Sequence, residues 1–130
     1  MSWVYIELPL YIRRCEKVSI SEEVRDSIKL WAPTVGRSET PRLKLVFRSP
    51  LNRYEAWNAR IPDPGSNRGK RSGYRLVYYL DLKENTINLL YIEERDELGF
   101  GKEGQRKKNA YNDLVRELKE MLSKMEHENK

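Results

Sequence analysis

The sequence of 130 residues contains one cysteine, Cys15, and one histidine, His127. A single cysteine cannot form an intramolecular disulfide, so we expect a reducing compartment. One cysteine and one histidine are too few for a zinc site with the usual number of ligands. They also argue against a nucleophile activated by histidine, and Cys15 reads as a buried, inert thiol. The sequence therefore predicts no metal and no other cofactor.

Long apolar runs and phosphate-binding glycine loops are also missing. The apolar stretch Trp3–Ile12 is interrupted by Glu7 and has no basic residue before it, unlike a signal peptide. No window reaches the roughly 18 apolar residues of a membrane span. Gly65, Gly69 and Gly73 match neither glycine fingerprint of nucleotide-binding loops. We expect a soluble protein of the cytoplasm.

The chain does have enough apolar material for one folded domain. Hydrophobic residues make up 38% of the sequence, including eight tyrosines and three tryptophans, which argues against a disordered chain. No repeat, low-complexity tract or linker divides it. We therefore predict a single domain over residues 1–130.

The positive charge is concentrated in one contiguous segment. The formal net charge is +5, yet residues 1–40 are neutral overall and residues 76–130 carry a net charge of −2. Residues 41–75 hold nine basic and two acidic side chains. Such segregation is expected where a polyanion binds, and the alternative is a solvated surface rich in loops. The nine basic residues are Arg42, Lys44, Arg48, Arg53, Arg60, Arg68, Lys70, Arg71 and Arg75.

Alternating, β-branched and aromatic patterns predict five strands. The last two are nearly all apolar or aromatic, and the link Asp81–Asn85 is short enough for a hairpin in the centre of a sheet. Residues 62–69 contain two prolines and two glycines and are typical of a loop. The predicted strands cover residues 3–8, 42–48, 53–61, 73–80 and 86–92.

Helical patterns lie towards both ends of the chain. Residues 21–31 form a predicted helix that Pro33 ends, and Pro9 stands where it could begin another. An apolar stripe predicts a C-terminal helix over residues 103–125, which packs on the sheet or serves a partner. The predicted fold class is α+β: a mainly antiparallel sheet with N-terminal helices and a C-terminal helix packed on it.

Four basic residues flank or enter the predicted fourth strand. Arg60 ends the strand before it, Lys70 and Arg71 lie in the loop, and Arg75 lies within it. If the two strands are neighbours, these charges meet in one patch. Tyr79 shares the face of Arg75 by the two-residue alternation. Aromatic rings beside guanidinium groups are typical of sites for single-stranded nucleic acid.

Cationic side chains can support cleavage of RNA, because the adjacent 2′-hydroxyl attacks the phosphate without needing a metal. Arginine and lysine stabilise the charge that builds on the phosphate oxygens. A tyrosine, lysine or glutamate can move the proton. The alternative is that Arg75 is structural and pairs with a carboxylate such as Glu93, and the residues alone leave both interpretations open.

The segment Lys70-Arg-Ser-Gly-Tyr-Arg-Leu-Val-Tyr-Tyr-Leu80 resembles the RelE and HigB messenger-RNA interferase toxins, which carry a Gly-Tyr-Arg strand after a basic loop. The opening Val4-Tyr-Ile-Glu-Leu-Pro9 and the strand Ile87-Asn-Leu-Leu-Tyr-Ile92 are similar to the HigB branch. The order of elements agrees over residues 3–122, although residues 33–56 match poorly.

The resemblance implies roles for individual residues. The family's arginine in the Gly-Tyr-Arg strand falls on Arg75, a basic residue near the end of the preceding strand on Arg60, and one after the last strand on Arg95. These three are the catalytic residues that the resemblance implies. The residues expected to bind RNA are Lys70, Arg71, Arg68, Lys44 and Tyr79.

Two positions depart from the family pattern. Asn58 stands where some relatives have a second lysine in the strand before the loop. The catalytic tyrosine that some relatives carry after the last strand has no close counterpart, and Phe100 and the more distant Tyr111 stand nearest. The general acid and base are therefore left unassigned.

The resemblance implies the toxin of a type II toxin–antitoxin system, an endoribonuclease that cleaves messenger RNA on the ribosome. It also implies a small antitoxin that covers the basic face, and it leaves open whether the chain forms a homodimer. Two alternatives stay open. The ParE toxins share the fold but bind DNA gyrase and cleave no RNA, and a degenerate member of the family would bind nucleic acid or a partner without cleaving.

Overall fold

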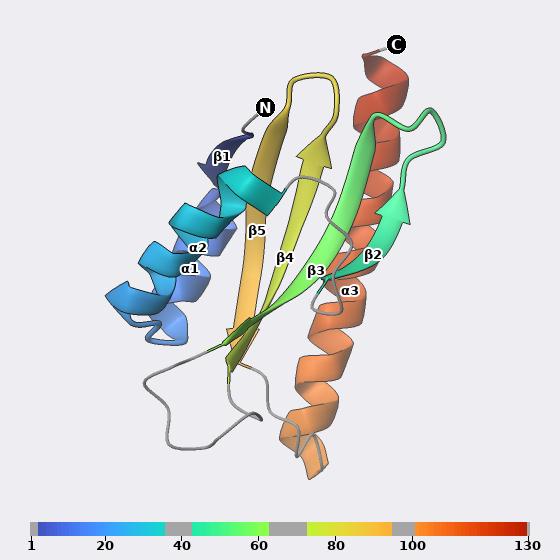
Figure 1. Cartoon of the computed structure of the whole chain (residues 1–130). Coiled ribbons are helices and arrows are strands. Elements are labelled where there is room, and N and C mark those ends of the chain that lie inside the picture. The colour runs from blue at the N-terminus through green and yellow to red at the C-terminus, as the bar shows by residue number, and fades with distance from the viewer. Residues whose placement is uncertain (1–2, 36–42, 63–72, 95–100, 130) are drawn as a thin grey trace.

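A sheet of five strands lies between two helical layers in the computed structural model, which describes residues 3–35, 43–62, 73–94 and 101–129 (Figure 1). The helices α1 (Pro9–Lys17) and α2 (Glu22–Val35) cover one face, and the long α3 (Gly101–Glu128) covers the other. The predicted α+β class is confirmed. The strands are β1 (Val4–Glu7), β2 (Leu43–Arg48), β3 (Tyr54–Pro62), β4 (Gly73–Asp81) and β5 (Thr86–Glu94).

The sheet has the strand order β1-β5-β4-β3-β2, so β1 and β2 form its edges. Only the pairing of β1 with β5 is parallel, and the other three pairings are antiparallel. The predicted hairpin forms between β4 and β5. The Asp81 carboxylate accepts hydrogen bonds from the backbone N–H groups of Lys83, at 3.0 Å, and Glu84, at 3.3 Å, and thereby closes the turn.

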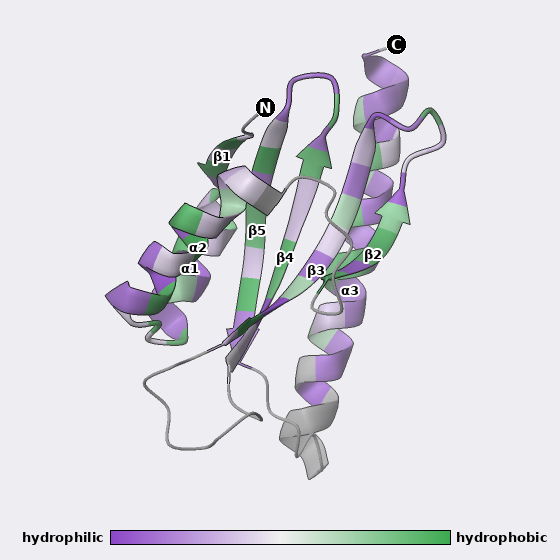
Figure 2. Ribbon diagram, viewed as in Figure 1, coloured by the Kyte–Doolittle hydropathy of each residue, from purple (hydrophilic) through white to green (hydrophobic). Residues whose placement is uncertain are grey.

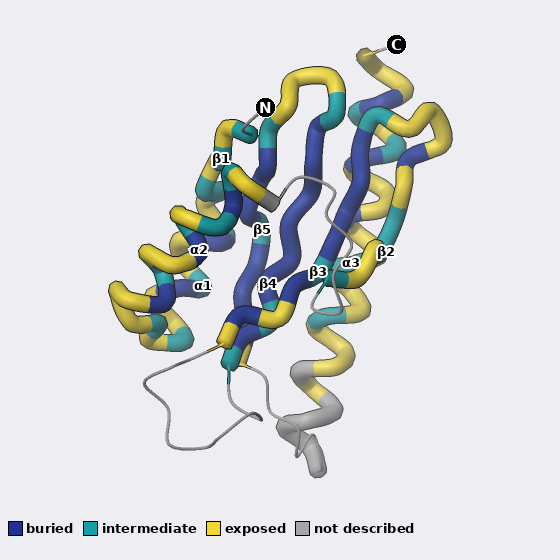
Figure 3. The backbone as a smooth tube through the Cα atoms, in the orientation of Figure 1, coloured by how far each residue is buried: buried dark blue, intermediate teal, exposed yellow. Residues whose placement is uncertain are grey.

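The two faces of the sheet build separate apolar cores, because successive side chains of a strand point in opposite directions. Trp57, Leu76 and Ile92 face α1 and α2, whereas Val77 and Tyr79 face α3. Figure 2 shows the mixture of apolar and polar residues along these strands. Figure 3 shows that β3, β4 and β5 are buried over most of their length. The predicted central position of β4 and β5 is confirmed.

Helix α2 is longer than predicted and continues through Pro33 to Val35. It begins after Ser21, whose hydroxyl accepts a hydrogen bond from the Val24 N–H at 3.2 Å. The prediction that Pro33 ends the helix was wrong. Pro33 lacks the N–H that would bond to the Lys29 carbonyl, but it lies in the last turn, so only Thr34 and Val35 follow it. Its carbonyl accepts a hydrogen bond from the Trp3 N–H at 3.0 Å, which ties the helix to the start of the chain.

Helix α3 has 28 residues, a length of about 42 Å at 1.5 Å per residue. Leu118 and Leu122 are buried against the sheet, so of the two outcomes considered for this helix the structure shows packing on the sheet. Near its C-terminus Glu126 reaches the β2–β3 turn. None of the described helices has the length and apolar character needed to cross a membrane.

Candidate nucleic-acid interface

Arg60 on β3 and Arg75 on β4 are direct cross-strand partners. Both belong to the set of alternate residues that faces α3, as do Asn58 and Val77. Arg60 is exposed, and the side chain of Arg75 keeps 40% of its surface exposed. Two cations placed opposite each other on one face repel. Glu93 compensates Arg75, and Arg60 also lines a pocket with Ser27 and Trp31 of α2. Both arginines keep surface that an anion such as a phosphate can reach.

Two neighbours fix the position of the Arg75 side chain. Its Nη1 lies 3.4 Å from Oε1 of Glu93, the cross-strand neighbour on β5. Its Cζ lies 4.6 Å from the ring centroid of Tyr111 on α3, a cation–π geometry. The Glu93 side chain is 9% exposed and also accepts a hydrogen bond from the Tyr91 hydroxyl at 3.3 Å. Arg75 is thus held in place while it still faces solvent.

The backbone requires glycine at the first position of the Gly-Tyr-Arg motif. Gly73 pairs with Pro62 and has a φ of +141°, a region that residues with a side chain rarely adopt. A Cβ atom at this position would lie 2.5 Å from the carbonyl oxygen of Ile61. Only glycine lets the two strands approach closely here. The pair Pro62–Gly73 is two residues away from the pair Arg60–Arg75 along both strands.

Tyr111 joins the basic pair through helix α3. Its hydroxyl accepts a hydrogen bond from Nδ2 of Asn58 at 2.8 Å. Asn58, the position that departs from the family pattern, thus contacts the tyrosine that in turn contacts Arg75. The distance of Tyr111 from β5 along the chain hid this placement, because sequence spacing shows it only as one member of an apolar stripe.

Lys44 lies beside this group on the edge strand β2. It is exposed and is the cross-strand partner of Asn58. Lys44, Asn58 and Tyr111 together line part of a groove of about 420 Å³ between β2 and α3. The structure therefore brings Lys44, Arg60 and Arg75 to one face. The sequence predicted a patch of Arg60, Lys70, Arg71 and Arg75, of which Lys70 and Arg71 lie outside the described residues.

Tyr79 lies in the core rather than at this surface. It is 8% exposed and packs edge to face on Tyr54, with ring centroids 6.2 Å apart. Burial raises the pKa of its hydroxyl. The alternation rule placed Tyr79 on the face of Arg75 correctly, but α3 covers that part of the face. A nucleic-acid base therefore cannot stack on Tyr79 in this fold, which corrects the role predicted for it.

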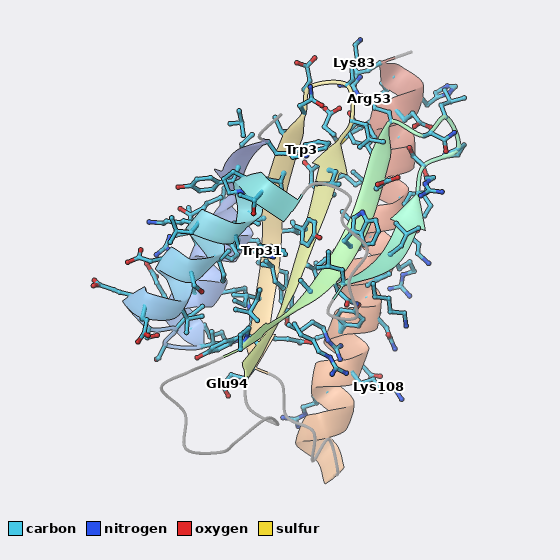
Figure 4. The ribbon with its side chains drawn as sticks, viewed as in Figure 1. Trp3, Trp31, Arg53, Lys83, Glu94 and Lys108 are labelled. Atoms are coloured by element: carbon cyan, nitrogen blue, oxygen red, sulfur yellow. The ribbon has the colours of Figure 1, made fainter. Side chains whose placement is uncertain are left out.

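Other predicted residues lie outside the described part of the chain. Three of them lie in the sequence between Pro62 and Gly73, and one follows Glu94 at the end of β5. Pro62 and Gly73 are paired at the same end of the sheet as Arg60 and Arg75. In Figure 4 Glu94 and Lys108 lie at this end, and Arg53 and Lys83 at the opposite one. The predicted residues outside the described part are Arg68, Lys70, Arg71 and Arg95.

The lone thiol takes no part in this surface. Cys15 is 2% exposed within the core under α1 and α2. Burial raises the pKa of its thiol, which disfavours the nucleophilic thiolate. Within the described ranges, no group of three or more His, Cys, Asp and Glu side chains is placed to hold a metal ion.

The arrangement of these elements is RelE-like. The fold is similar to a chain of the archaeal RelE–RelB complex from Pyrococcus horikoshii OT3, with a TM-score of 0.52 and 14% sequence identity. The match covers 75% of this chain and 99% of that one. No family model and no curated protein sequence matches this chain. The likeness is therefore one of fold, as the Gly-Tyr-Arg segment implied.

Proposed function

We propose that this protein is a toxin of the RelE type, an endoribonuclease that cleaves messenger RNA. The observation that carries the proposal is the cross-strand pair Arg60–Arg75 on the sheet face towards α3, where Tyr111 contacts Arg75. Adjacent guanidinium groups can each donate two hydrogen bonds to the oxygens of one phosphate. The RelE-like fold supports this proposal, because the structure that it matches was solved as a RelE–RelB complex.

Cleavage by this site would need only the substrate's own nucleophile. The 2′-oxygen forms a bond to phosphorus while the bond from phosphorus to the 5′-oxygen breaks, leaving a cyclic phosphate and a 5′-hydroxyl. Negative charge builds on the non-bridging oxygens during this step. Arg60 and Arg75 would stabilise that charge, a contribution of about 10²–10³-fold in rate for one well-placed donor.

The proton of the 2′-hydroxyl passes to solvent water in this reaction, and another proton must reach the leaving 5′-oxygen. Tyr111 and Glu93 are both beside Arg75 and can exchange a proton. The Tyr111 hydroxyl accepts a hydrogen bond from Asn58 and keeps its own hydrogen to donate, whereas Glu93 is engaged by Arg75 and Tyr91. We assign Tyr111 to protonation of the leaving 5′-oxygen. Arg95, Arg68, Lys70 and Arg71 keep their proposed roles in catalysis and in binding RNA phosphates.

The proposal includes two partners. An antitoxin would cover the basic face, since the structural neighbour was solved with RelB, and its acidic side chains would neutralise the repelling arginine pair. The ribosome would present the message in a cleavable geometry. Weak cleavage of free RNA is then the expected behaviour of the purified chain. The cytoplasm, where messages and ribosomes lie, would be its compartment.

The test is to induce the wild type and Arg75→Ala in a bacterial host and follow growth and transcript ends. The wild type should arrest growth and cut messages, and Arg75→Ala should lower the cleavage rate about 10²–10³-fold. Lys83→Ala, on the exposed β4–β5 turn, is the matched control and should behave as the wild type. Circular dichroism of both variants excludes misfolding as the cause.

A second candidate function has one observation in its favour. Arg75 already contacts Glu93 and Tyr111, as a structural arginine would, and this suits a ParE-like protein that inhibits gyrase by binding. Growth arrest with intact messages would select that function over RNA cleavage. The absence of any arrest would select a degenerate member that binds without cleaving.

A further inference from the structure

The groove between β2 and α3 carries three cations that the proposed cleavage step does not use. Lys44 stands on the strand side, and Arg116 and Lys119 stand on the helix side. All three are exposed. No carboxylate lines this groove among the described residues. The site is therefore positive on both walls, although α3 as a whole carries many acidic residues.

The cations are available to a ligand. Arg116 contacts Asp113 at 3.0 Å, but the two side chains are 67% and 60% exposed, and exposed ion pairs of this kind exchange partners at little cost. Within the described part of the chain, Lys44 and Lys119 contact no carboxylate within 4.0 Å. A phosphate chain can thus pair with these groups without breaking a buried interaction.

Between its charged walls the groove offers surface for a base or ribose. Val46, Val115 and Tyr111 line this space. The volume of about 420 Å³ lies in the range of roughly 300–1,000 Å³ that small-molecule sites occupy. A polyanion with flat apolar bases fits this combination, because single strands pair their phosphates with cations and stack their bases.

The groove continues into the candidate cleavage site. Tyr111 lines the groove and its ring also contacts Arg75, while Asn58 lies between Lys44 on β2 and Arg75's neighbour Val77 on β4. One chain of nucleotides could therefore touch Arg75 and the groove together. The direct link through Tyr111 makes the groove an extension of one site rather than a separate surface.

We propose that this groove binds the single-stranded RNA next to the cleaved phosphate, with Lys44, Arg116 and Lys119 holding the backbone. This inference rests on the proposed endoribonuclease function and adds a binding subsite to it. Its residues position substrate and take no part in the bond-breaking step. Their loss should weaken RNA binding and raise KM while kcat stays the same.

The test compares Arg116→Ala/Lys119→Ala with Arg13→Ala/Lys17→Ala, which removes the same charge from the exposed side of α1 on the opposite face. The probe is a 2′-O-methylated single-stranded RNA of about 12 nucleotides, within the usual site size, measured by fluorescence anisotropy. The groove variant should raise Kd about 5- to 20-fold, as expected for two exposed charge contacts. It should also lower the slope of log K against log salt by about 1.4. The control should change Kd less than about twofold.

The outcomes separate the inference from the proposed function. Unchanged binding in the groove variant, with binding lost in Arg60→Ala or Arg75→Ala, overturns the groove and leaves the cleavage site standing. Weaker binding in the groove variant of a protein that cuts no RNA upholds the groove and overturns the endoribonuclease. Equal binding of a poly-glutamate peptide, with the same loss in the variant, assigns the groove to an acidic peptide and overturns the RNA assignment.

Discussion

The two ends of helix α3 are built for different tasks. Towards the C-terminus, Leu118 and Leu122 are buried and Glu126 is 4% exposed. Towards the N-terminus, Tyr111 touches the polar side chains Asn58 and Arg75 of the sheet. Figure 3 shows the buried positions of α3 in its C-terminal half and exposed residues further from the C-terminus.

Glu126 anchors the C-terminal end of α3 to the turn between β2 and β3. Its carboxylate accepts hydrogen bonds from the Leu51 N–H at 2.7 Å, the Arg53 N–H at 3.1 Å and the Ser49 hydroxyl. A buried carboxylate with several donors is stable only where its charge is fully compensated. The comparison teaches that the C-terminal end of α3 supplies stability, whereas Tyr111 nearer the N-terminal end serves the polar surface with Asn58 and Arg75.

The largest expected effect on stability lies at the fastened end. Leu122→Ala removes a fully buried side chain and should lower the free energy of unfolding by about 2–5 kcal/mol. Leu114 lies nearer the N-terminal end of α3 and is only partly buried. Leu114→Ala should therefore lower the free energy of unfolding by less than about 2 kcal/mol. Urea unfolding followed by circular dichroism measures both. Equal losses would contradict a helix fastened at one end.

Glu126→Gln should lower the free energy of unfolding by about 1–3 kcal/mol, because an amide NH₂ would face a backbone N–H. Burial raises the pKa of Glu126, but the hydrogen bonds from Ser49, Leu51 and Arg53 outweigh it and hold the pKa below its ordinary value. The stabilisation is therefore fully present above the unfolded pKa of about 4.3 and is lost as the pH falls through the folded pKa.

The pH dependence separates this carboxylate from a merely space-filling residue. The difference in Tm between the wild type and Glu126→Gln should be constant at neutral pH and narrow below about pH 4.3. Asp81, whose pKa is raised by burial but lowered further by Arg53 and by backbone N–H groups, is present in both proteins and cancels. A difference that stays constant down to about pH 3 would count against the charged form.

Gly73→Ala tests the end of the sheet that carries Arg60 and Arg75. The added Cβ meets the Ile61 carbonyl at 2.5 Å and forces a residue with a side chain to a φ of +141°. We expect the free energy of unfolding to fall by about 1–3 kcal/mol. RNA cleavage should also fall, because the strands that align Arg60 and Arg75 must separate. Thermal unfolding and cleavage assays together check this, and a variant with full activity would contradict it.

The smallest change in stability is expected for Tyr111→Phe. It removes one hydrogen bond to Asn58 and keeps the ring under Arg75, a loss of about 0.5–1.5 kcal/mol. Cleavage should fall further, by about 10²-fold, if the hydroxyl protonates the leaving oxygen. Asn58→Ala removes the same hydrogen bond but keeps the hydroxyl, so it should retain most of the activity. Equal rates for the two variants would remove Tyr111 from the proton transfer.

Local patterns predicted most of the elements, because strand and helix periodicities are written in adjacent residues. The hairpin of β4 and β5 and the α3 stripe show this, since both are long and strongly patterned. The end of α2 was not predictable in this way. Pro33 stops a helix in isolation, yet here the packing of Ala32 and the hydrogen bond from Trp3 hold one more turn in place.

The sequence by itself determined the fold class, the segment that carries the positive charge and the Gly-Tyr-Arg strand, because composition and alternation are local properties. Only the tertiary structure decided which residues share a surface. It placed Tyr111 against Arg75 and Asn58 although they lie far apart along the chain, and it buried Tyr79 beneath α3. Contacts between distant segments depend on strand order and on which face a helix covers, and neither is encoded in the spacing of neighbouring residues.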